Sequence, residues 1–74
     1  MNELRIRIGE ILLRSRLTKT ELARRINAPK SQVTMVCNGH MRPSRNLATR
    51  IATELAQDPG QLFQEWEIFD EAAS

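Results

Sequence analysis

The sequence predicts an all-α domain of five short helices, and three observations support this fold class. The 74 residues are enough for one domain with one modest hydrophobic core. Hydrophobic residues make up 41% of the chain but aromatic residues only 4%, which argues against most β-rich folds. Aliphatic residues recur at intervals of three and four along successive segments, as they do in amphipathic helices.

The first helix is expected to extend from Leu4 to about Arg16. The residues of its apolar stripe are Leu4, Ile8, Ile11 and Leu12. Gly9 lies inside this helix, where glycine costs about 1 kcal/mol relative to alanine. We therefore expect another backbone to pack closely against Gly9.

A Thr-x-x-Glu capping box marks the start of the second helix. The Thr18 hydroxyl is expected to accept a hydrogen bond from the amide of residue 21, while the Glu21 carboxylate reaches back to the Thr18 amide. The helix must end near Asn27, because Pro29 disfavours a helical conformation at the residue before it and asparagine tolerates a left-handed one. Its inward residues are Leu22, Ala23 and Ile26, and its solvated residues are Arg24 and Arg25.

The third helix is expected to begin with Pro29 or Lys30 in its first turn and to run to Asn38, with Gly39 as the residue that terminates it. Its inward residues are Val33, Val36 and Cys37. The outer side is then left to Lys30, Ser31, Gln32, Thr34 and Met35.

Two further helices are expected after the loop at residues 40–43. Ser44 caps the fourth helix, which ends near Gln57 and has an apolar stripe of Leu47, Ala48, Ile51, Ala52 and Leu55. Asp58 and Pro59 are a cap and first-turn pair, so a short fifth helix should place Leu62, Phe63 and Trp66 against the core.

The C-terminal segment combines acidic residues with three large apolar ones, Trp66, Ile68 and Phe69. These three either cover the base of the core or form a dimer contact, and the sequence leaves both possibilities open. We divide the chain into a folded domain at residues 1–66 and an acidic tail at 67–74. The last four or five residues are expected to be disordered.

The charge is unevenly distributed along the chain. Residues 1–50 contain all eleven Lys and Arg and only three acids, for a net charge of +8, whereas residues 51–74 contain six acids and a net charge of −6. A basic segment of this kind suits binding to a polyanion, because each Lys or Arg on a phosphate releases a condensed counterion. The acidic segment should stay away from that polyanion.

Several other classes of protein are disfavoured. Cys37 is the only cysteine, so it cannot form an internal disulfide or a cysteine cluster, and we interpret it as a small packed thiol in a reducing compartment. His40 has no metal-ligating neighbours and is expected in a solvated loop. We expect no enzyme activity, metal or cofactor, because paired carboxylates, a Ser-His set and a phosphate-binding loop are absent. Neither a signal peptide nor a membrane span is apparent, which favours the cytoplasm.

The second and third helices, joined by a turn of about three residues, have the arrangement of a helix-turn-helix motif. Residues 6–63 resemble the Cro and lambda-repressor-like (XRE) family of DNA-binding domains. The segments that carry the resemblance are 8–12 (IGEIL), 17–23 (LTKTELA), 37–39 (CNG), 42–44 (RPS) and 58–63 (DPGQLF). Three positions depart from the family pattern: no glycine stands near Arg16, Asn27 occupies the turn, and Lys19 stands where glutamine is common.

The resemblance implies that helix 30–37 enters the major groove of double-stranded DNA. The implied base contacts are Lys30, Ser31, Gln32, Thr34 and Met35. The implied phosphate contacts are Thr18, Lys19, Asn38, Arg42 and Arg45. Lys19 in place of glutamine puts in doubt a side-chain bridge to the recognition helix and is expected to act as a point charge on a phosphate.

The leading hypothesis is a sequence-specific transcriptional regulator, a repressor of the phage or mobile-element kind that binds a palindromic operator as a homodimer. It would be a cytoplasmic bacterial protein, associated with the nucleoid when bound. A second hypothesis is an antitoxin or a restriction-modification controller that also binds a protein partner through residues 64–74. A third is a protein-interaction module that has lost DNA binding, against which the +8 charge of the first half argues.

Overall fold

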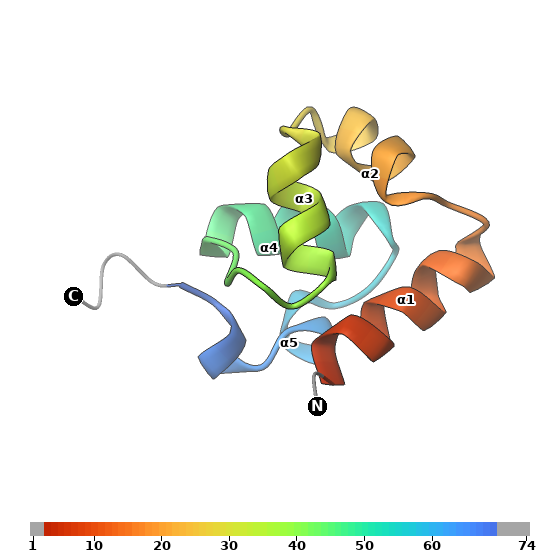
Figure 1. The fold of residues 1–74 in the computed structure, drawn as a ribbon. Coiled ribbons are helices and arrows are strands. Elements are labelled where there is room, and N and C mark those ends of the chain that lie inside the picture. Colours follow the sequence, from red (N-terminus) through yellow and green to blue (C-terminus); the bar gives the residue numbers. More distant parts are fainter. Residues whose placement is uncertain (1–2, 70–74) are drawn as a thin grey trace.

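The computed structural model describes residues 3–69, and this part of the chain is helical without β-strands. The expected all-α fold with five helices is confirmed (Figure 1). The elements are α1 (Glu3–Ser15), α2 (Lys19–Ile26), α3 (Lys30–Cys37), α4 (Arg45–Glu54) and α5 (Pro59–Leu62), followed by a 3₁₀ turn, η1 (Glu65–Glu67). No helix within residues 3–69 is long and apolar enough to cross a membrane.

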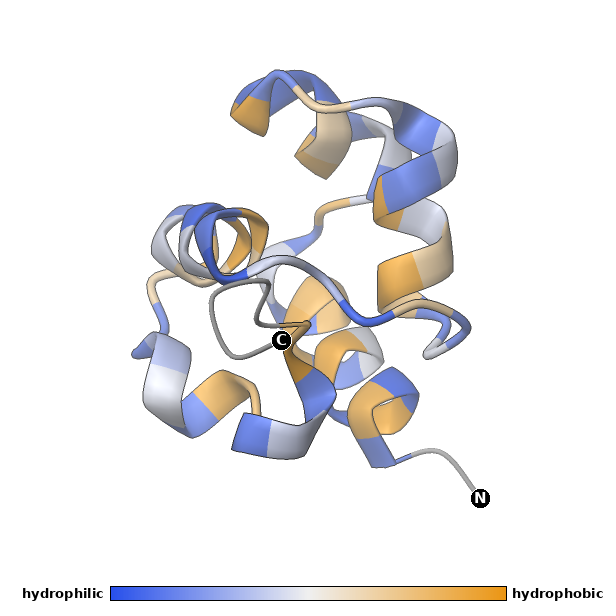
Figure 2. Ribbon diagram, turned by 90° about the vertical axis from the view of Figure 1, so that its left-hand side faces the viewer, coloured by the Kyte–Doolittle hydropathy of each residue, from blue (hydrophilic) through white to orange (hydrophobic). Residues whose placement is uncertain are grey.

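One hydrophobic core joins all five α-helices. The fully enclosed side chains include Ile8 of α1, Leu22 of α2, Val33 of α3, Ile51 of α4 and Leu62 of α5. Figure 2 shows that the hydrophobic segments of the helices turn toward the middle of the domain. The predicted apolar stripes of the first four helices are therefore confirmed. Burial of each such aliphatic side chain contributes about 1.5–3 kcal/mol to folding.

The predicted caps are confirmed at three helix starts. The Thr18 hydroxyl accepts the Glu21 amide at 3.0 Å, the Ser44 hydroxyl accepts the Leu47 amide at 3.2 Å, and an Asp58 carboxylate oxygen accepts the Gly60 amide at 2.8 Å. The other half of the Thr18 capping box is not formed as expected. The Glu21 carboxylate is instead bound by the Arg24 guanidinium, and this hydrogen bond lowers the pKa of Glu21.

Left-handed residues terminate the first, second and fourth helices. Arg16, Asn27 and Ala56 have φ values of 55°, 57° and 56°, and Gly39 after α3 has φ 78°. The sequence correctly assigned this role to Asn27 and Gly39. The fourth helix ends at Glu54 rather than near Gln57, because the left-handed Ala56 reverses the chain and lets the amide of residue 57 donate to the carbonyl of Ala52 at 2.8 Å.

Two packing expectations are wrong. Gly9 is exposed, and no atom of another element lies within 4 Å of the position a Cβ would occupy, so nothing in the structure explains this glycine. Trp66 is 71% exposed rather than packed on the core. The chain becomes extended at Phe63 after only four residues of α5, and Ile68 takes the buried position near the core instead. The segment at residues 70–74, which was expected to be disordered, lies outside the described residues.

Ala56 provides a test of the left-handed helix end. A left-handed conformation destabilises a non-glycine residue by about 1–2 kcal/mol. Glycine avoids this cost but lowers the stability of the native state by about 0.4–1 kcal/mol relative to alanine, because it makes the unfolded chain more flexible. Ala56→Gly should therefore raise the free energy of unfolding by about 0.5–1 kcal/mol in urea titrations. Thr53→Gly, on the exposed face of α4, should lower it by about 0.5 kcal/mol. Destabilisation by both substitutions would contradict the assigned conformation.

Candidate nucleic-acid interface

The turn between α2 and α3 is tight and is held from several sides. Asn27 adopts φ 57° and ψ 47°, and the amide of Ala28 donates to the carbonyl of Ala23 at 3.0 Å. The Arg50 guanidinium of α4 also donates to the carbonyl of Ile26, so the end of α2 is tied to a third helix. The two helices are therefore held in a defined relative position, as a helix-turn-helix unit requires.

The inner face of α3 is buried in the core. Val33 and Val36 are 0% exposed and Cys37 is 1% exposed. Lys30, Ser31, Gln32 and Met35 are exposed, and Thr34 is partly buried. The structure thus places these residues on the outer side of α3, as the sequence predicted. In Figure 1, α3 lies in front of α4. Which of these side chains contact bases stays a prediction.

The candidate phosphate contacts lie on the elements that flank α3. Figure 1 shows the start of α2 on one side of α3 and the loop into α4 on the other. Thr18 caps α2 and Lys19 begins it, whereas Arg42 lies in the loop and Arg45 begins α4. The side chains of Thr18, Arg42 and Arg45 are at least partly accessible, and Asn38 caps the C-terminal end of α3. This arrangement places polar groups on both sides of the helix that carries the candidate base contacts.

Lys19 does bridge the two helices, contrary to the expectation from its departure from the family pattern. Its ammonium donates a hydrogen bond to the Oδ1 atom of Asn38, the residue that caps α3. The bridge is possible because the amide side chain of Asn38 presents an acceptor to the start of α2. An ammonium has three N–H donors, so Lys19 keeps two for another acceptor, such as a phosphate oxygen.

Ion pairs alter the charge separation that the sequence predicted. Glu67 binds Arg7 at 3.1 Å and Glu65 binds Arg45 at 3.1 Å. Acidic residues of the segment 51–74 therefore pair with arginines of the basic segment 1–50. Arg7 also donates to the carbonyl of Leu62. Sequence reasoning missed these contacts, since nothing in the spacing of residues some 20 to 60 positions apart indicates them. Within residues 3–69, Lys30 and Arg42 form no ion pair.

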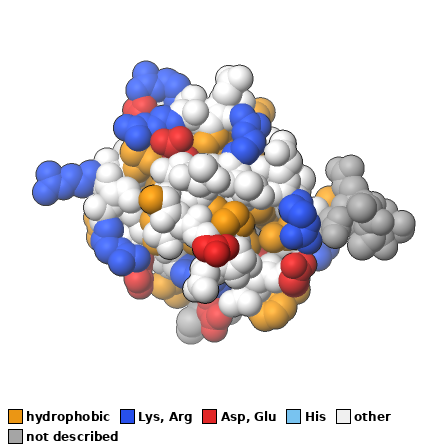
Figure 3. Space-filling view, turned by 180° about the vertical axis from the view of Figure 1, so that it is seen from behind, with side chains coloured by type: hydrophobic (Ala, Val, Ile, Leu, Met, Phe, Trp, Pro, Cys, Tyr) orange, Lys and Arg blue, Asp and Glu red, His pale blue; other side chains and the backbone are white. Residues whose placement is uncertain are grey.

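The back of the molecule has a different charge pattern. Figure 3, seen from behind, shows acidic side chains near the middle and the lower part of this face and basic side chains mainly around its edge. Because α3 lies in front of α4 in Figure 1, the face in Figure 3 is opposite to the one that α3 presents. The mixed charges on this back face offer a polyanion no continuous basic surface in that view.

The fold and the site define a helix-turn-helix protein. A family model described as a Cro/C1-type HTH DNA-binding domain matches residues 4–64, and the chain belongs to this family of DNA-binding domains. Members of the family are typically not enzymes. Comparison with curated proteins and with solved structures found no match. The resemblance inferred from the sequence is thus confirmed.

Cys37 provides a test of how tightly α3 packs. Burial raises the pKa of its thiol from 9.0 to about 11, although the nearby charge of Lys19 acts in the opposite direction. Since the thiolate is the reactive form, alkylation by iodoacetamide at pH 8 should be at least about 100-fold slower in the native protein than in denaturant. Equal rates would show that α3 is not packed as described.

The same pKa shift predicts a dependence of stability on pH. Between about pH 9 and pH 11 the unfolded chain loses the thiol proton while the native protein retains it, so the free energy of unfolding should fall as the pH rises. Below pH 9 the thiol is protonated in both states, so its contribution to stability is fully present. Cys37→Ala should lack this dependence, which urea titrations of both proteins at several pH values would measure.

Proposed function

We propose that this protein is a sequence-specific transcriptional regulator that binds double-stranded DNA with α3 in the major groove. The observation that carries the proposal is the outer face of α3, which presents exposed polar side chains between two flanking elements with candidate phosphate contacts. An α-helix fits the major groove, and helix-turn-helix domains dock with the first helix across the backbone and the second in the groove.

Specific roles follow from the chemistry of the exposed side chains. Gln32 suits bidentate recognition of adenine, Lys30 can reach guanine O6 and N7, and Met35 can pack on a thymine methyl group. Ser31 and Thr34 offer short hydroxyls to either kind of base edge. A good bidentate contact is worth about 1–3 kcal/mol of discrimination, so a few such contacts suffice to define a half-site.

The flanking groups would fix the register of α3 on the duplex. In this role Thr18, Lys19, Asn38, Arg42 and Arg45 contact phosphates without reading sequence. Arg45 must exchange its Glu65 partner for a phosphate when DNA binds. This exchange costs little, because Glu65 is 82% exposed and exposed ion pairs contribute at most about 1 kcal/mol.

The regulator would act as a dimer on a palindromic operator with half-sites about one helical turn apart. An operator that overlaps a promoter would make it a repressor, of the phage or mobile-element kind, in the bacterial cytoplasm and on the nucleoid. Selection of genomic DNA fragments with the purified protein, followed by sequencing, identifies the operator. Enrichment of an inverted repeat is expected, and weak binding without enrichment at low salt would refute the proposal.

Gln32→Ala tests base recognition. The variant should bind the selected operator about 5- to 100-fold more weakly, and the preference at one base pair of each half-site should relax. Binding to random DNA should hardly change, because no phosphate contact is lost. An equal loss on operator and random DNA, measured by fluorescence anisotropy, would contradict the assigned role of Gln32.

Arg42→Ala tests phosphate contact. Binding should weaken on all sequences, and the slope of log K against log salt should fall in magnitude by about 1 per copy. Arg25→Ala is the matched control, because it removes the same charge from an arginine that pairs with Glu54 of α4 and has no proposed contact with DNA. An equal change of slope in both variants would show that only the overall charge matters.

A further inference from the structure

The exposed tryptophan is an aromatic feature that the DNA-binding role does not explain. Trp66 is the only tryptophan of the chain, and 71% of it is exposed at the tip of η1. Phe69, three residues later, is 45% exposed. Large aromatic side chains are enriched in protein interfaces, where burial of a single one contributes strongly to binding.

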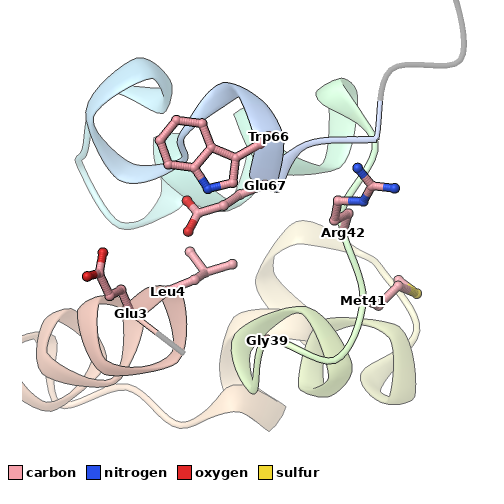
Figure 4. A pocket seen from close by; sticks show the side chains of 7 residues that line it. All are labelled: Glu3, Leu4, Gly39, Met41, Arg42, Trp66 and Glu67. Carbon is pink, nitrogen blue, oxygen red and sulfur yellow. The ribbon is translucent and has the colours of Figure 1, made fainter. Parts of the chain in front are cut away.

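Trp66 borders a surface hollow of about 340 Å³. Figure 4 shows the indole ring and Glu67 on one side of the hollow, the start of α1 with Glu3 and Leu4 beside them, and the chain after α3 with Met41 and Arg42 on the opposite side. A large apolar group and a concave site therefore lie next to each other on the same surface. This combination is what a self-complementary patch needs.

The turn that carries Trp66 is firmly attached to the domain. The Arg7 guanidinium binds the Glu67 carboxylate at 3.1 and 3.2 Å, and the same carboxylate accepts the Gln64 amide at 2.7 Å. On the other side Ile68 is buried, and the amide of Phe69 donates to the carbonyl of Pro43 at 2.7 Å. The exposure of Trp66 thus arises on an ordered segment, and little conformational entropy is lost when a partner covers it.

We propose that a second copy of this chain covers the hollow, so that Trp66 of each copy packs into the hollow of the other. The charges around the hollow favour this occupant, because exposed Glu3 and exposed Arg42 lie on opposite sides of it. A two-fold axis between the two sides brings Arg42 of one copy toward Glu3 of the other. In the absence of DNA, such an isologous contact pairs both charges in each copy.

The proposed contact is compatible with DNA binding, and this step rests on the proposed function. The hollow lies beyond the C-terminal end of α3, whereas Lys30, Ser31 and Gln32 lie at its N-terminal end and stay uncovered. Arg42 lines the hollow and is also a proposed phosphate contact, so it exchanges Glu3 of the other copy for a phosphate when DNA binds, as Arg45 exchanges Glu65. The domain measures 36 × 26 × 21 Å. Two copies that touch at an edge can therefore place their α3 helices near the spacing of about 34 Å between successive major-groove half-sites.

Sedimentation and the fluorescence of the single tryptophan test the contact without DNA. As the concentration of the wild-type protein rises, monomer should convert to dimer and the Trp66 emission should shift to shorter wavelength. Trp66→Ala should raise the dimer Kd at least about 30-fold, as measured by sedimentation. Leu13→Ala, which removes an 80% exposed apolar side chain from the outer face of α1, is the matched control and should leave Kd unchanged.

Charge variants give a second test that does not depend on the tryptophan. Glu3→Arg should weaken the dimer because it faces Arg42 of the other copy, whereas Glu10→Arg, the same change at an exposed site outside the hollow, should not. A wild-type protein that stays monomeric at millimolar concentration would overturn the proposal. So would a Trp66→Ala dimer as tight as the wild type, or equal effects of Glu3→Arg and Glu10→Arg.

DNA titrations separate this proposal from the proposed function. Trp66→Ala should still bind a single half-site with the affinity and salt dependence of the wild type, and it should lose cooperative binding to the inverted repeat. Loss of cooperativity with Leu13→Ala as well would overturn the proposed dimer surface while DNA binding stands. If the wild type dimerises through Trp66 but binds no DNA, the dimer surface stands and the proposed function fails.

Discussion

The burial of one side of α3 is the constraint on which the rest of the structure depends. An isolated helix of eight residues is not stable in water, because so few hydrogen bonds do not compensate for the ordering of its backbone. Val33, Val36 and Cys37 make α3 stable by packing against the other helices. The same packing determines which side chains face outward, so the candidate base contacts are positioned by residues that never touch a ligand.

The ends of the helices determine where the chain turns and so how the helices pack against one another. Left-handed residues at Arg16, Asn27 and Ala56 turn the chain sharply, and hydroxyl or carboxylate caps start α2, α4 and α5. Among the left-handed residues at positions 3–69, only Gly39 adopts this conformation without steric cost. The three other positions are left-handed without a glycine, so burial elsewhere in the core must offset the strain.

Charge and apolar exposure are distributed by contacts between distant segments. Acidic residues near the C-terminus pair with arginines of α1 and α4, which reduces the free positive charge of the domain and attaches η1 to its side. That attachment leaves Trp66 facing solvent while Ile68 completes the core. Ile68, which the sequence placed in a separate acidic tail, thus contributes to the core, and Trp66, just before that tail, adds an aromatic group to the surface.

The sequence by itself determined the five helices, their apolar stripes, most of their caps and the family of the domain, because these features follow from spacings of two to four residues. It also identified the outer residues of α3, since a short amphipathic helix leaves little choice of face. Only the tertiary structure decided the partners of Lys19, Arg7 and Arg50, the earlier end of α4 and the exposure of Trp66. These depend on which distant segments meet in space, and local periodicity carries no information about that.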